Sequence, residues 1–345
     1  MKKFDNIKIG ISVGDINGIG IEVILKTFED SRILELFTPI IFASNKTVSL
    51  HKKELNISTQ IHGIENASKA ISNKVNLVNV WKEHVDVHFG EETKEGGKYA
   101  LLSLNAAMNA LKKDEIDVLV TAPINKHNIQ SESFKYQGHT EFLEANLEGE
   151  SLMILMTDEL RIGLITGHIP IQKIAESITP EIIEKKVGIM YQSLIQDFNI
   201  SKPKIAVLGL NPHCGDNGVI GKEDDEIIRP TLEKIQNQGR LVYGPYSADS
   251  FFGSKAYLNF DGILAMYHDQ GLAPFKTLSF GEGVNFTAGL NKVRTSPDHG
   301  TGYEIAGKGL ANNGSFKQAV FMAVEIYKSR KEYEELVENR LAVRK

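Results

Sequence analysis

The chain of 345 residues carries 39 Lys and Arg against 44 Asp and Glu, which gives a formal net charge of −5. This acidic balance gives no global electrostatic reason to bind nucleic acid, and the absence of any run of eighteen apolar residues excludes an ordinary transmembrane helix. A single cysteine, Cys214, excludes an intramolecular disulfide framework and fits a reducing cytoplasm, while the length exceeds the usual size of one compact core and predicts two lobes.

Apolar runs that are typical of strands alternate with helical patterns along almost the entire chain. Short runs bounded by Gly, Asp or Pro predict strands at Ile7–Val13, Ile40–Ala43, Ile116–Thr121, Leu152–Met156, Arg161–Thr166, Lys204–Leu210 and Ile263–Tyr267. Apolar residues at steps of three and four predict helices at Ile21–Phe28, Lys98–Lys112, Pro180–Asp197, Lys222–Gln236 and Phe316–Leu341. The alternation predicts an α/β fold with a mostly parallel sheet and helices on both faces.

The first predicted strand is followed by a glycine cluster, GDINGIGIE, at Gly14–Glu22. Its backbone amides could hold an anion, but its spacing departs from the dinucleotide fingerprint and it lacks the Lys-Ser/Thr of a P-loop. A tight turn in which glycines supply unusual backbone angles is an equally good interpretation. The carboxylate of Asp15 could face a ligand crevice or cap the next helix.

Three histidines each stand at the end of an apolar run that is typical of a buried strand. His168 ends RIGLITGH, His213 ends KIAVLGLNPH and His268 ends GILAMYH. The carboxyl ends of parallel strands open onto the ligand crevice, so these residues can converge despite their separation in the sequence. One such histidine alone would most simply cap its strand, but three imidazoles in one cleft indicate a divalent metal.

Further polar residues follow other predicted strands. The segments TAPINKH at Thr121–His127 and GHTEF at Gly138–Phe142 supply Asn125, Lys126, His139 and Thr140 as donors to an oxyanion, or as ordinary turn and surface residues. Between His268 and Arg294, the chain places Lys276, Asn285 and Arg294 among apolar residues. Such donors in an acidic protein indicate a substrate with phosphate or carboxylate groups.

The segment DHGTGYEIAGKGLANNG at Asp298–Gly314 is similar to the cofactor loop of the isocitrate and isopropylmalate dehydrogenases, which receives the adenosine portion of NAD. The whole chain resembles the 4-hydroxythreonine-4-phosphate dehydrogenase family of that superfamily. The resemblance runs in order through GDINGIGIE, TAPINK, GHTEFL, GHIPI, LNPHCGD, GPYSADSFF, AMYHDQGL, GVNFTAGL and RTSPDHGT. It implies a two-lobed α/β/α fold with a cleft between the lobes, here expected at 1–130 plus 275–345 for the cofactor and 131–274 for metal, substrate and dimerisation.

Residue by residue, the resemblance implies the following site. A divalent ion such as zinc, cobalt or magnesium would be held by His168, His213 and His268, with His268 contributed by the partner subunit of a homodimer. Substrate would be bound by His139, Thr140, Lys276, Asn285 and Arg294, and NAD or NADP by Asp298, His299, Gly300, Ala306, Gly307 and Gly309. The residue that removes the hydroxyl proton is left open among Asp249, Asp269 and Lys126.

The resemblance implies oxidation of 4-phosphooxy-L-threonine at its 3-hydroxyl in pyridoxal phosphate synthesis, with decarboxylation to 3-amino-2-oxopropyl phosphate. The metal would act as a Lewis acid, and three histidines would leave coordination positions for substrate oxygens. Relatives acting on other phosphorylated hydroxy acids share much of the pattern. A metal-dependent phosphoester hydrolase and a non-catalytic sensor of a phosphorylated metabolite are the other classes, and the Asp298–Gly314 segment favours the dehydrogenase over both.

Overall fold

The computed structural model describes residues 6–279 and 281–338, and these residues form two compact units. Unit 1 comprises the residues up to Glu148 together with Asn291–Lys328, and unit 2 comprises Gly149–Leu290 and the residues from Ser329 onward. Each unit contains strands and helices, which confirms the α/β class and the expectation of two lobes. The functional division of the chain into a cofactor lobe and a substrate lobe, with its expected boundaries, stays a prediction.

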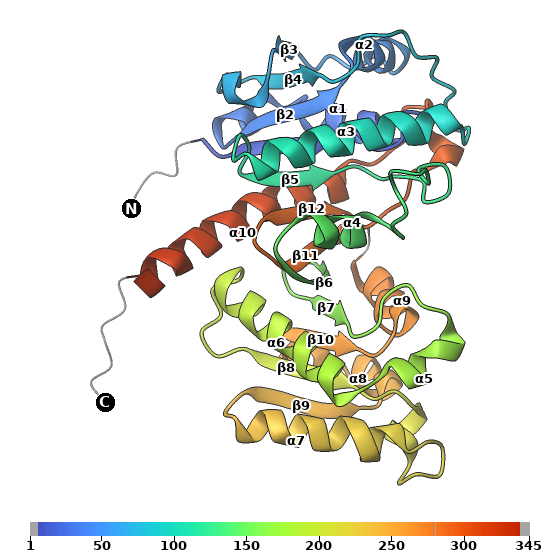
Figure 1. The fold of residues 1–345 in the computed structure, drawn as a ribbon, viewed down its shortest axis with the longest axis vertical. Helices are drawn as coiled ribbons and strands as arrows, with labels where there is room; N and C mark the ends of the chain where they lie inside the picture. The colour runs from blue at the N-terminus through green and yellow to red at the C-terminus, as the bar shows by residue number, and fades with distance from the viewer. Residues whose placement is uncertain (1–5, 280, 339–345) are drawn as a thin grey trace. The chain divides into compact units, whose positions relative to one another are not determined.

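Unit 1 is built on six parallel strands in the order β3-β4-β2-β1-β5-β12. The strands are β1 (Lys8–Ser12), β2 (Thr38–Ala43), β3 (Ile61–Ile64), β4 (Val75–Asn79), β5 (Val118–Thr121) and β12 (Val293–Pro297). Its α-helices are α1 (Gly20–Thr27), α2 (Asn45–Glu54), α3 (Lys94–Lys112), α4 (His139–Asn146) and most of α10 (Gly314–Glu338). Figure 1 shows α3 lying over the sheet of this unit, with its axis roughly along the strands. Every residue of β2 is buried, as expected for a parallel strand covered on both faces.

Unit 2 contains six strands in the order β11-β6-β7-β10-β8-β9. They are β6 (Gly149–Met156), β7 (Arg161–Leu164), β8 (Lys204–Leu208), β9 (Leu241–Tyr246), β10 (Gly262–Ala265) and β11 (Val284–Leu290). Strands β7, β10, β8 and β9 are parallel, whereas β6 pairs antiparallel with both β7 and β11. The helices are α5 (Ile174–Ser177), α6 (Pro180–Gln196), α7 (Arg229–Asn237), α8 (Ala248–Gly253) and α9 (His268–Ser279) (Figure 1).

All seven predicted strands and all five predicted helices are present, with ends shifted by a few residues. The helix predicted from Lys222 begins instead as a π-helix over Asp224–Ile228 before α7. The predicted end of the last helix at Leu341 lies outside the described residues. Strands β3, β4, β9, β11 and β12 and the helices α2, α4, α5, α8 and α9 were not predicted, because they are short or because their polar residues interrupt the apolar pattern.

The glycine cluster at Gly14–Gly20 forms a buried turn between β1 and α1. Gly14 has φ of +67°, and a Cβ there would lie 2.1 Å from the carbonyl oxygen of Pro123. A Cβ on Gly18 would lie 2.6 Å from the carbonyl oxygen of Thr301. These positions require glycine because the backbone of neighbouring segments approaches them closely. The tight turn, one of the two interpretations left open by the sequence, therefore accounts for these glycines.

His51 of α2 is fully buried beside this turn. Its Nε2 lies 2.9 Å from the carbonyl oxygen of Ile16, and its ring packs edge-on against Phe89 with centroids 4.8 Å apart. Burial lowers the pKa of His51 to about 4, although the hydrogen bond to Ile16 opposes the shift. The imidazole is therefore neutral at physiological pH and donates Nε2–H to the turn.

We predict that His51 makes unit 1 sensitive to acid. Its pKa is lower in the folded than in the unfolded chain, so the unfolded chain binds more protons and stability falls as pH drops from about 6.5 to about 4. The loss should approach about 3 kcal/mol, at about 1.4 kcal/mol per pKa unit. Urea unfolding at several pH values between 7 and 4 measures this loss of unfolding free energy.

The control for this prediction is His51→Gln, which keeps an N–H donor for the turn but does not titrate. Its stability should fall less steeply over the same pH range than that of the wild-type chain. Identical pH profiles for the two proteins would show that His51 does not control the acid response.

Candidate active site

Two of the three strand-end histidines lie together in unit 2. His168 follows β7 and His268 begins α9 directly beyond β10, and these two strands are parallel neighbours. The ring centroids of His168 and His268 are 5.2 Å apart. His268 Nδ1 lies 2.6 Å from a carboxylate oxygen of Asp269, an exposed side chain. A carboxylate in this position orients the imidazole and leaves Nε2 available to a metal ion.

The third histidine lies in a different setting within the same unit. His213 belongs to the loop after β8, where it adopts φ of +53°. It lines a pocket of about 230 Å³ together with Ser247, Asp249, Tyr267 and Gln270. The described residues contain no group of three or more His, Cys, Asp or Glu side chains arranged to hold a metal ion. His168 and His268 therefore form a close pair within one chain, and the pocket that His213 lines includes Tyr267 and Gln270 on either side of His268.

Asp249 is the candidate base that shares a pocket with His213. Its carboxylate accepts a hydrogen bond from Ser247 Oγ at 2.6 Å. This bond and the backbone N–H of Ser250 hold the pKa of Asp249 below its usual range, and the charge of His213 adds to the effect. The side chain is therefore ionised at neutral pH, the state that a general base requires.

The predicted phosphate donor Arg294 lies on β12 and is only 2% exposed. Its Nε and one terminal nitrogen donate to Thr121 Oγ1 at 3.1 and 2.6 Å. Burial lowers the pKa of Arg294 to about 9, while the charge of Glu141 favours the protonated form. A guanidinium at this depth stays charged at neutral pH and requires negative groups nearby.

His139, another predicted residue of unit 1, lies near this guanidinium and near Lys126. His139 and Thr140 begin α4, and Lys126 lies on the exposed segment after β5. Burial, and then the charges of Arg294 and Lys126, hold the pKa of His139 well below its usual range. His139 is therefore neutral and can accept one hydrogen bond and donate another. The sequence analysis missed Glu141, although it stands within the GHTEF motif that supplied His139 and Thr140.

The predicted substrate residues of unit 2 lie on two elements. Lys276 is exposed on α9, and Asn285 lies on β11, paired in register with Leu155 of β6. The side-chain oxygen of Asn285 is buried and has no hydrogen-bond partner among the described residues. The structure therefore gives Asn285 an unused acceptor and places Lys276 where it meets solvent.

The predicted cofactor segment lies in unit 1 after β12. The backbone N–H of Asp298 donates a hydrogen bond to Ser315 Oγ at the start of α10, at 3.2 Å. Gly307 has φ of +75°, and a Cβ there would lie 2.7 Å from the ring of Phe89. At Gly300 and Gly309, by contrast, a Cβ would meet nothing within 4 Å. Backbone at these two positions is open to the close approach of a ligand.

Unsatisfied polar atoms mark three of the predicted site residues. His139 Nε2, Asn285 Oδ1 and His299 Nε2 are buried, and none has a hydrogen-bond partner among the residues that the structure describes. Leaving such an atom unpaired costs about 1–3 kcal/mol, so folded proteins rarely do so without a reason. Polar groups of a bound substrate and cofactor would satisfy all three.

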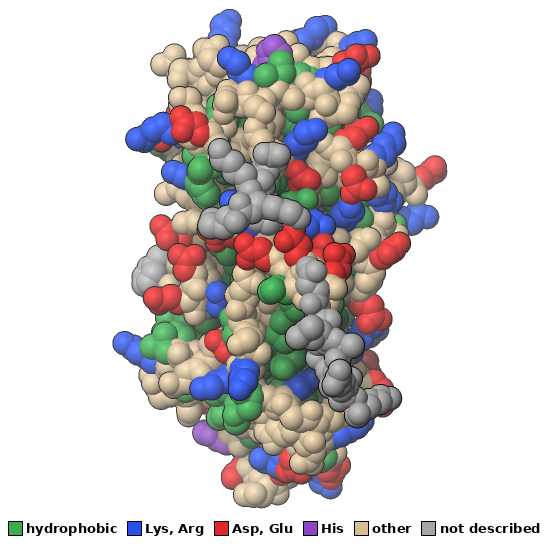
Figure 2. All heavy atoms as spheres, turned by 90° about the vertical axis from the view of Figure 1, so that its left-hand side faces the viewer, with side chains coloured by type: hydrophobic (Ala, Val, Ile, Leu, Met, Phe, Trp, Pro, Cys, Tyr) green, Lys and Arg blue, Asp and Glu red, His purple; other side chains and the backbone are tan. Residues whose placement is uncertain are grey.

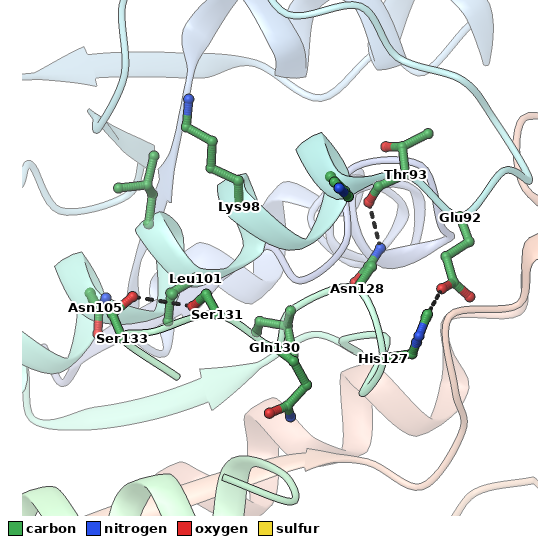
Figure 3. A pocket seen from close by; sticks show the side chains of 13 residues that line it. Glu92, Thr93, Lys98, Leu101, Asn105, His127, Asn128, Gln130, Ser131 and Ser133 are labelled. Atoms are coloured by element: carbon green, nitrogen blue, oxygen red, sulfur yellow. Dashed lines mark hydrogen bonds and ion pairs between the residues drawn. The ribbon is translucent and has the colours of Figure 1, made fainter. Parts of the chain in front are cut away.

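A second pocket, of about 810 Å³, lies in unit 1 and contains none of the predicted site residues. It is lined by α3 and by the segment 127–133. Figure 3 shows Asn128 directed toward Thr93 and His127 directed toward Glu92 at its rim. The nitrogen of Asn128 also donates to Asp15, so one wall of this pocket is tied to the glycine turn.

Charged side chains of both signs are scattered over the face drawn in Figure 2, without a continuous basic surface. This mixture of signs agrees with the small net charge of −5. In the part of the chain that the structure describes, no helix combines the length and apolar character needed to cross a bilayer.

Known proteins of one family match this chain in both sequence and fold. Residues 35–323 match the family model described as pyridoxal phosphate biosynthetic protein PdxA. The chain belongs to this family. It is 52% identical over 328 residues to 4-hydroxythreonine-4-phosphate dehydrogenase of Bacteroides thetaiotaomicron, which covers 94% of this chain and 90% of the relative. The corresponding protein of Sulfurihydrogenibium sp. is 39% identical, covering 94% of this chain and all of that protein.

Solved structures of PdxA family members have the same fold. The 4-hydroxythreonine-4-phosphate dehydrogenase of Klebsiella pneumoniae superposes with a TM-score of 0.80 at 28% identity, covering 93% of this chain and 100% of that chain. The Burkholderia phymatum enzyme gives a TM-score of 0.75 at 33% identity, covering 93% and 98%. The family resemblance inferred from ordered motifs is thus confirmed.

We predict that Arg294 and Glu141 stabilise unit 1 as a coupled pair. Arg294→Met should cost about 3 kcal/mol of unfolding free energy, because it removes the buried cation that faces the Glu141 carboxylate. Adding Glu141→Gln to that variant should recover at least about 1 kcal/mol, since the carboxylate is then neutralised. Urea unfolding of the single and double variants measures the coupling, and strictly additive losses would contradict it.

Proposed function

We propose that this PdxA family member oxidises 4-phosphooxy-L-threonine to 2-amino-3-oxo-4-phosphooxybutanoate with NAD or NADP as hydride acceptor. The product is a β-keto acid that decarboxylates to 3-amino-2-oxopropyl phosphate, a precursor in pyridoxal phosphate synthesis. The observation that carries the substrate assignment is the fully buried Arg294 guanidinium beside His139, whose Nε2 lacks a partner within the described chain. A dianionic phosphate supplies the charge and the acceptors that such a site requires.

Substrate recognition is assigned to groups of different character. Arg294, His139 and Thr140 supply donors in unit 1, and the positive charge of Lys276 and the amide of Asn285 supply donors and an acceptor in unit 2. The unused oxygen of Asn285 suits a donor such as the substrate ammonium group. The positive charges of Arg294 and Lys276 would favour phosphorylated over unphosphorylated hydroxy acids.

The cofactor is assigned to the segment after β12. Asp298, His299 and Gly300 would receive one part of NAD or NADP, and Ala306, Gly307 and Gly309 another. The unpartnered His299 Nε2 and the open space at Gly300 and Gly309 fit a bound dinucleotide. Bound there, the nicotinamide would accept the hydride from the substrate carbon.

The histidines fit a divalent metal only when two chains are considered. His168 and His268 form a close pair of imidazoles in one chain, whereas His213 lies outside any three-ligand group of the described residues. We therefore assign His168 and His268 to one chain and His213 to a partner in a homodimer. The resemblance assigned His268 to the partner, but the pairing of the two rings favours this division. A cation such as zinc or cobalt would supply Lewis acidity toward the substrate hydroxyl.

Removal of the hydroxyl proton is assigned to one of three residues. Asp249 is ionised and lies beside His213, so the partner that supplies His213 would bring Asp249 with it. Asp269 accepts a hydrogen bond from His268, and Lys126 lies near His139. The shared location of Asp249 and His213 favours Asp249. The single cysteine and this metabolic role fit a cytoplasmic enzyme.

We predict NAD(P)H formation, followed at 340 nm, when the metal-loaded protein meets 4-phosphooxy-L-threonine and NAD or NADP. The unphosphorylated 4-hydroxy-L-threonine should react at least about a hundredfold less efficiently in kcat/KM, because it forfeits the charge-assisted contacts with Arg294. Release of inorganic phosphate without NAD(P)H would instead identify a hydrolase.

We also predict that inactive variants complement each other across a dimer. Mixed His213→Ala and His268→Ala chains should recover roughly a quarter of wild-type activity, because about half of the randomly paired dimers are mixed and each mixed dimer has one intact site. Subunit exchange is verified with two affinity tags.

The matched control mixes His168→Ala with His268→Ala chains. Since both residues belong to one half of the proposed site, each site of a mixed dimer carries one defect and activity should stay absent. Recovery in this control would place His168 and His268 in different chains. No recovery in either mixture, with exchange verified, would refute a shared site.

A further inference from the structure

The buried turn at Gly14–Gly20 holds a carboxylate that the proposed reaction does not use. Asp15 is 1% exposed and accepts three hydrogen bonds. They come from the backbone N–H of Asn17 at 2.9 Å, from Asn128 Nδ2 at 2.7 Å and from the Tyr303 hydroxyl at 2.8 Å. Burying a carboxylate without hydrogen-bond donors is costly, and these three donors replace the water that the side chain loses on folding.

Tyr303 connects this carboxylate to the proposed cofactor segment. It lies between His299 and Gly307, the two parts of the segment to which NAD is assigned. Burial, followed by the hydrogen bond to Asp15, raises the pKa of Tyr303 above its usual range. The phenol therefore stays protonated and always donates to Asp15, which fixes the middle of the segment.

The same turn and helix α1 hold the segment at two further points. The backbone N–H of Ile19 donates to the carbonyl of Thr301 at 2.9 Å. On α1, Lys26 Nζ donates to the carbonyls of Gly309 and Ala311 at 2.8 and 2.9 Å, and Glu22 accepts the backbone N–H of Ala311 at 3.0 Å.

Beneath the segment, the ring of Phe89 contacts Gly307, and the buried His51 packs on Phe89. These contacts fix the segment on either side of Tyr303. At Tyr303 itself, the hydroxyl donates to the Asp15 carboxylate and also interacts with the side chains of Asn128, which binds Asp15 as well, and of Asn125. Asp15 is thus the centre of the polar network at this point.

We propose that Asp15 is a positioning residue that acts through Tyr303 to hold residues 299–309 in the conformation that binds NAD or NADP. The inference rests on the proposed assignment of this segment to the cofactor. It gives the glycine cluster a role in cofactor affinity without contact with the cofactor. A flexible loop with several glycines would lose much conformational entropy when it binds a ligand. Because Tyr303 is already fixed in the free protein, part of this entropy is lost on folding and binding is weakened less.

Tyr303→Phe tests the proposal, because it removes the donor while keeping the ring and leaving Asp15 its two other hydrogen bonds. Calorimetric titration without substrate should show NAD binding weakened about tenfold, while KM for 4-phosphooxy-L-threonine changes less than about twofold. Hydrogen exchange of the backbone amides at 300–309 should become faster in the free protein. The matched control is Tyr99→Phe, which removes the hydroxyl that donates to Glu83 at 3.2 Å elsewhere in unit 1 and should change neither quantity.

Asp15→Asn and the Asp15→Asn/Tyr303→Phe double variant separate positioning from direct contact. If Tyr303 acts through Asp15, the double variant should bind NAD about as weakly as the weaker single variant. Additive losses would show that Tyr303 contacts the cofactor itself and would overturn the proposal. If Asp15→Asn does not fold, hydrogen exchange in the Tyr303→Phe variant tests the positioning role instead. Unchanged exchange of the amides at 300–309 would then overturn the proposal.

The failures of the two proposals are distinguishable. Wild-type protein that binds NAD, together with a Tyr303→Phe variant that binds equally well, would overturn the positioning role alone. Wild-type protein that binds neither NAD nor NADP would overturn both the positioning role and the proposed dehydrogenase function.

Discussion

The buried carboxylate of Asp15 is the constraint on which the arrangement of unit 1 depends. A carboxylate at 1% exposure needs hydrogen-bond donors, and Asp15 accepts them from Asn17 of the turn, Asn128 of the segment after β5 and Tyr303 of the segment after β12. The glycines around Asp15 permit this convergence, since a Cβ at Gly96 would lie 2.7 Å from its carboxylate oxygen. Three segments far apart in the sequence are thereby held at the carboxyl ends of neighbouring strands.

The proposed chemistry uses the complementary situation, in which buried groups keep unused hydrogen-bonding capacity. Asp15 is satisfied within the chain, whereas His139 Nε2, Asn285 Oδ1 and His299 Nε2 are not. A satisfied polar network positions backbone, whereas at these three predicted site residues a bound ligand would supply the missing partner. In the proposed metal site, the close pair formed by His168 and His268 would likewise need a further ligand, which the proposed homodimer would supply.

Much of the fold could be predicted from the sequence because parallel strands buried on both faces are continuous apolar runs. Strands such as β11 (VNFTAGL) and β12 (VRTSP) carry polar residues in the same pattern, so the sequence could not separate them from loops. The motif at Asp298–Gly314 was predicted to be a cofactor segment, but its attachment to Asp15 depends on a contact across 288 positions in the sequence. The role of Glu141 as the charge facing Arg294, and the close pairing of the His168 and His268 rings, likewise depend on tertiary packing.

The central claim is that the unsatisfied buried atoms are the recognition groups for a phosphorylated hydroxy amino acid and a nicotinamide cofactor. A crystal structure of the protein with NAD and 4-phosphooxy-L-threonine tests it most directly. The account predicts His139 Nε2 and Asn285 Oδ1 within hydrogen-bond distance of the substrate and His299 Nε2 within hydrogen-bond distance of the cofactor. Both ligands bound elsewhere, with these three atoms paired to protein or water, would contradict it.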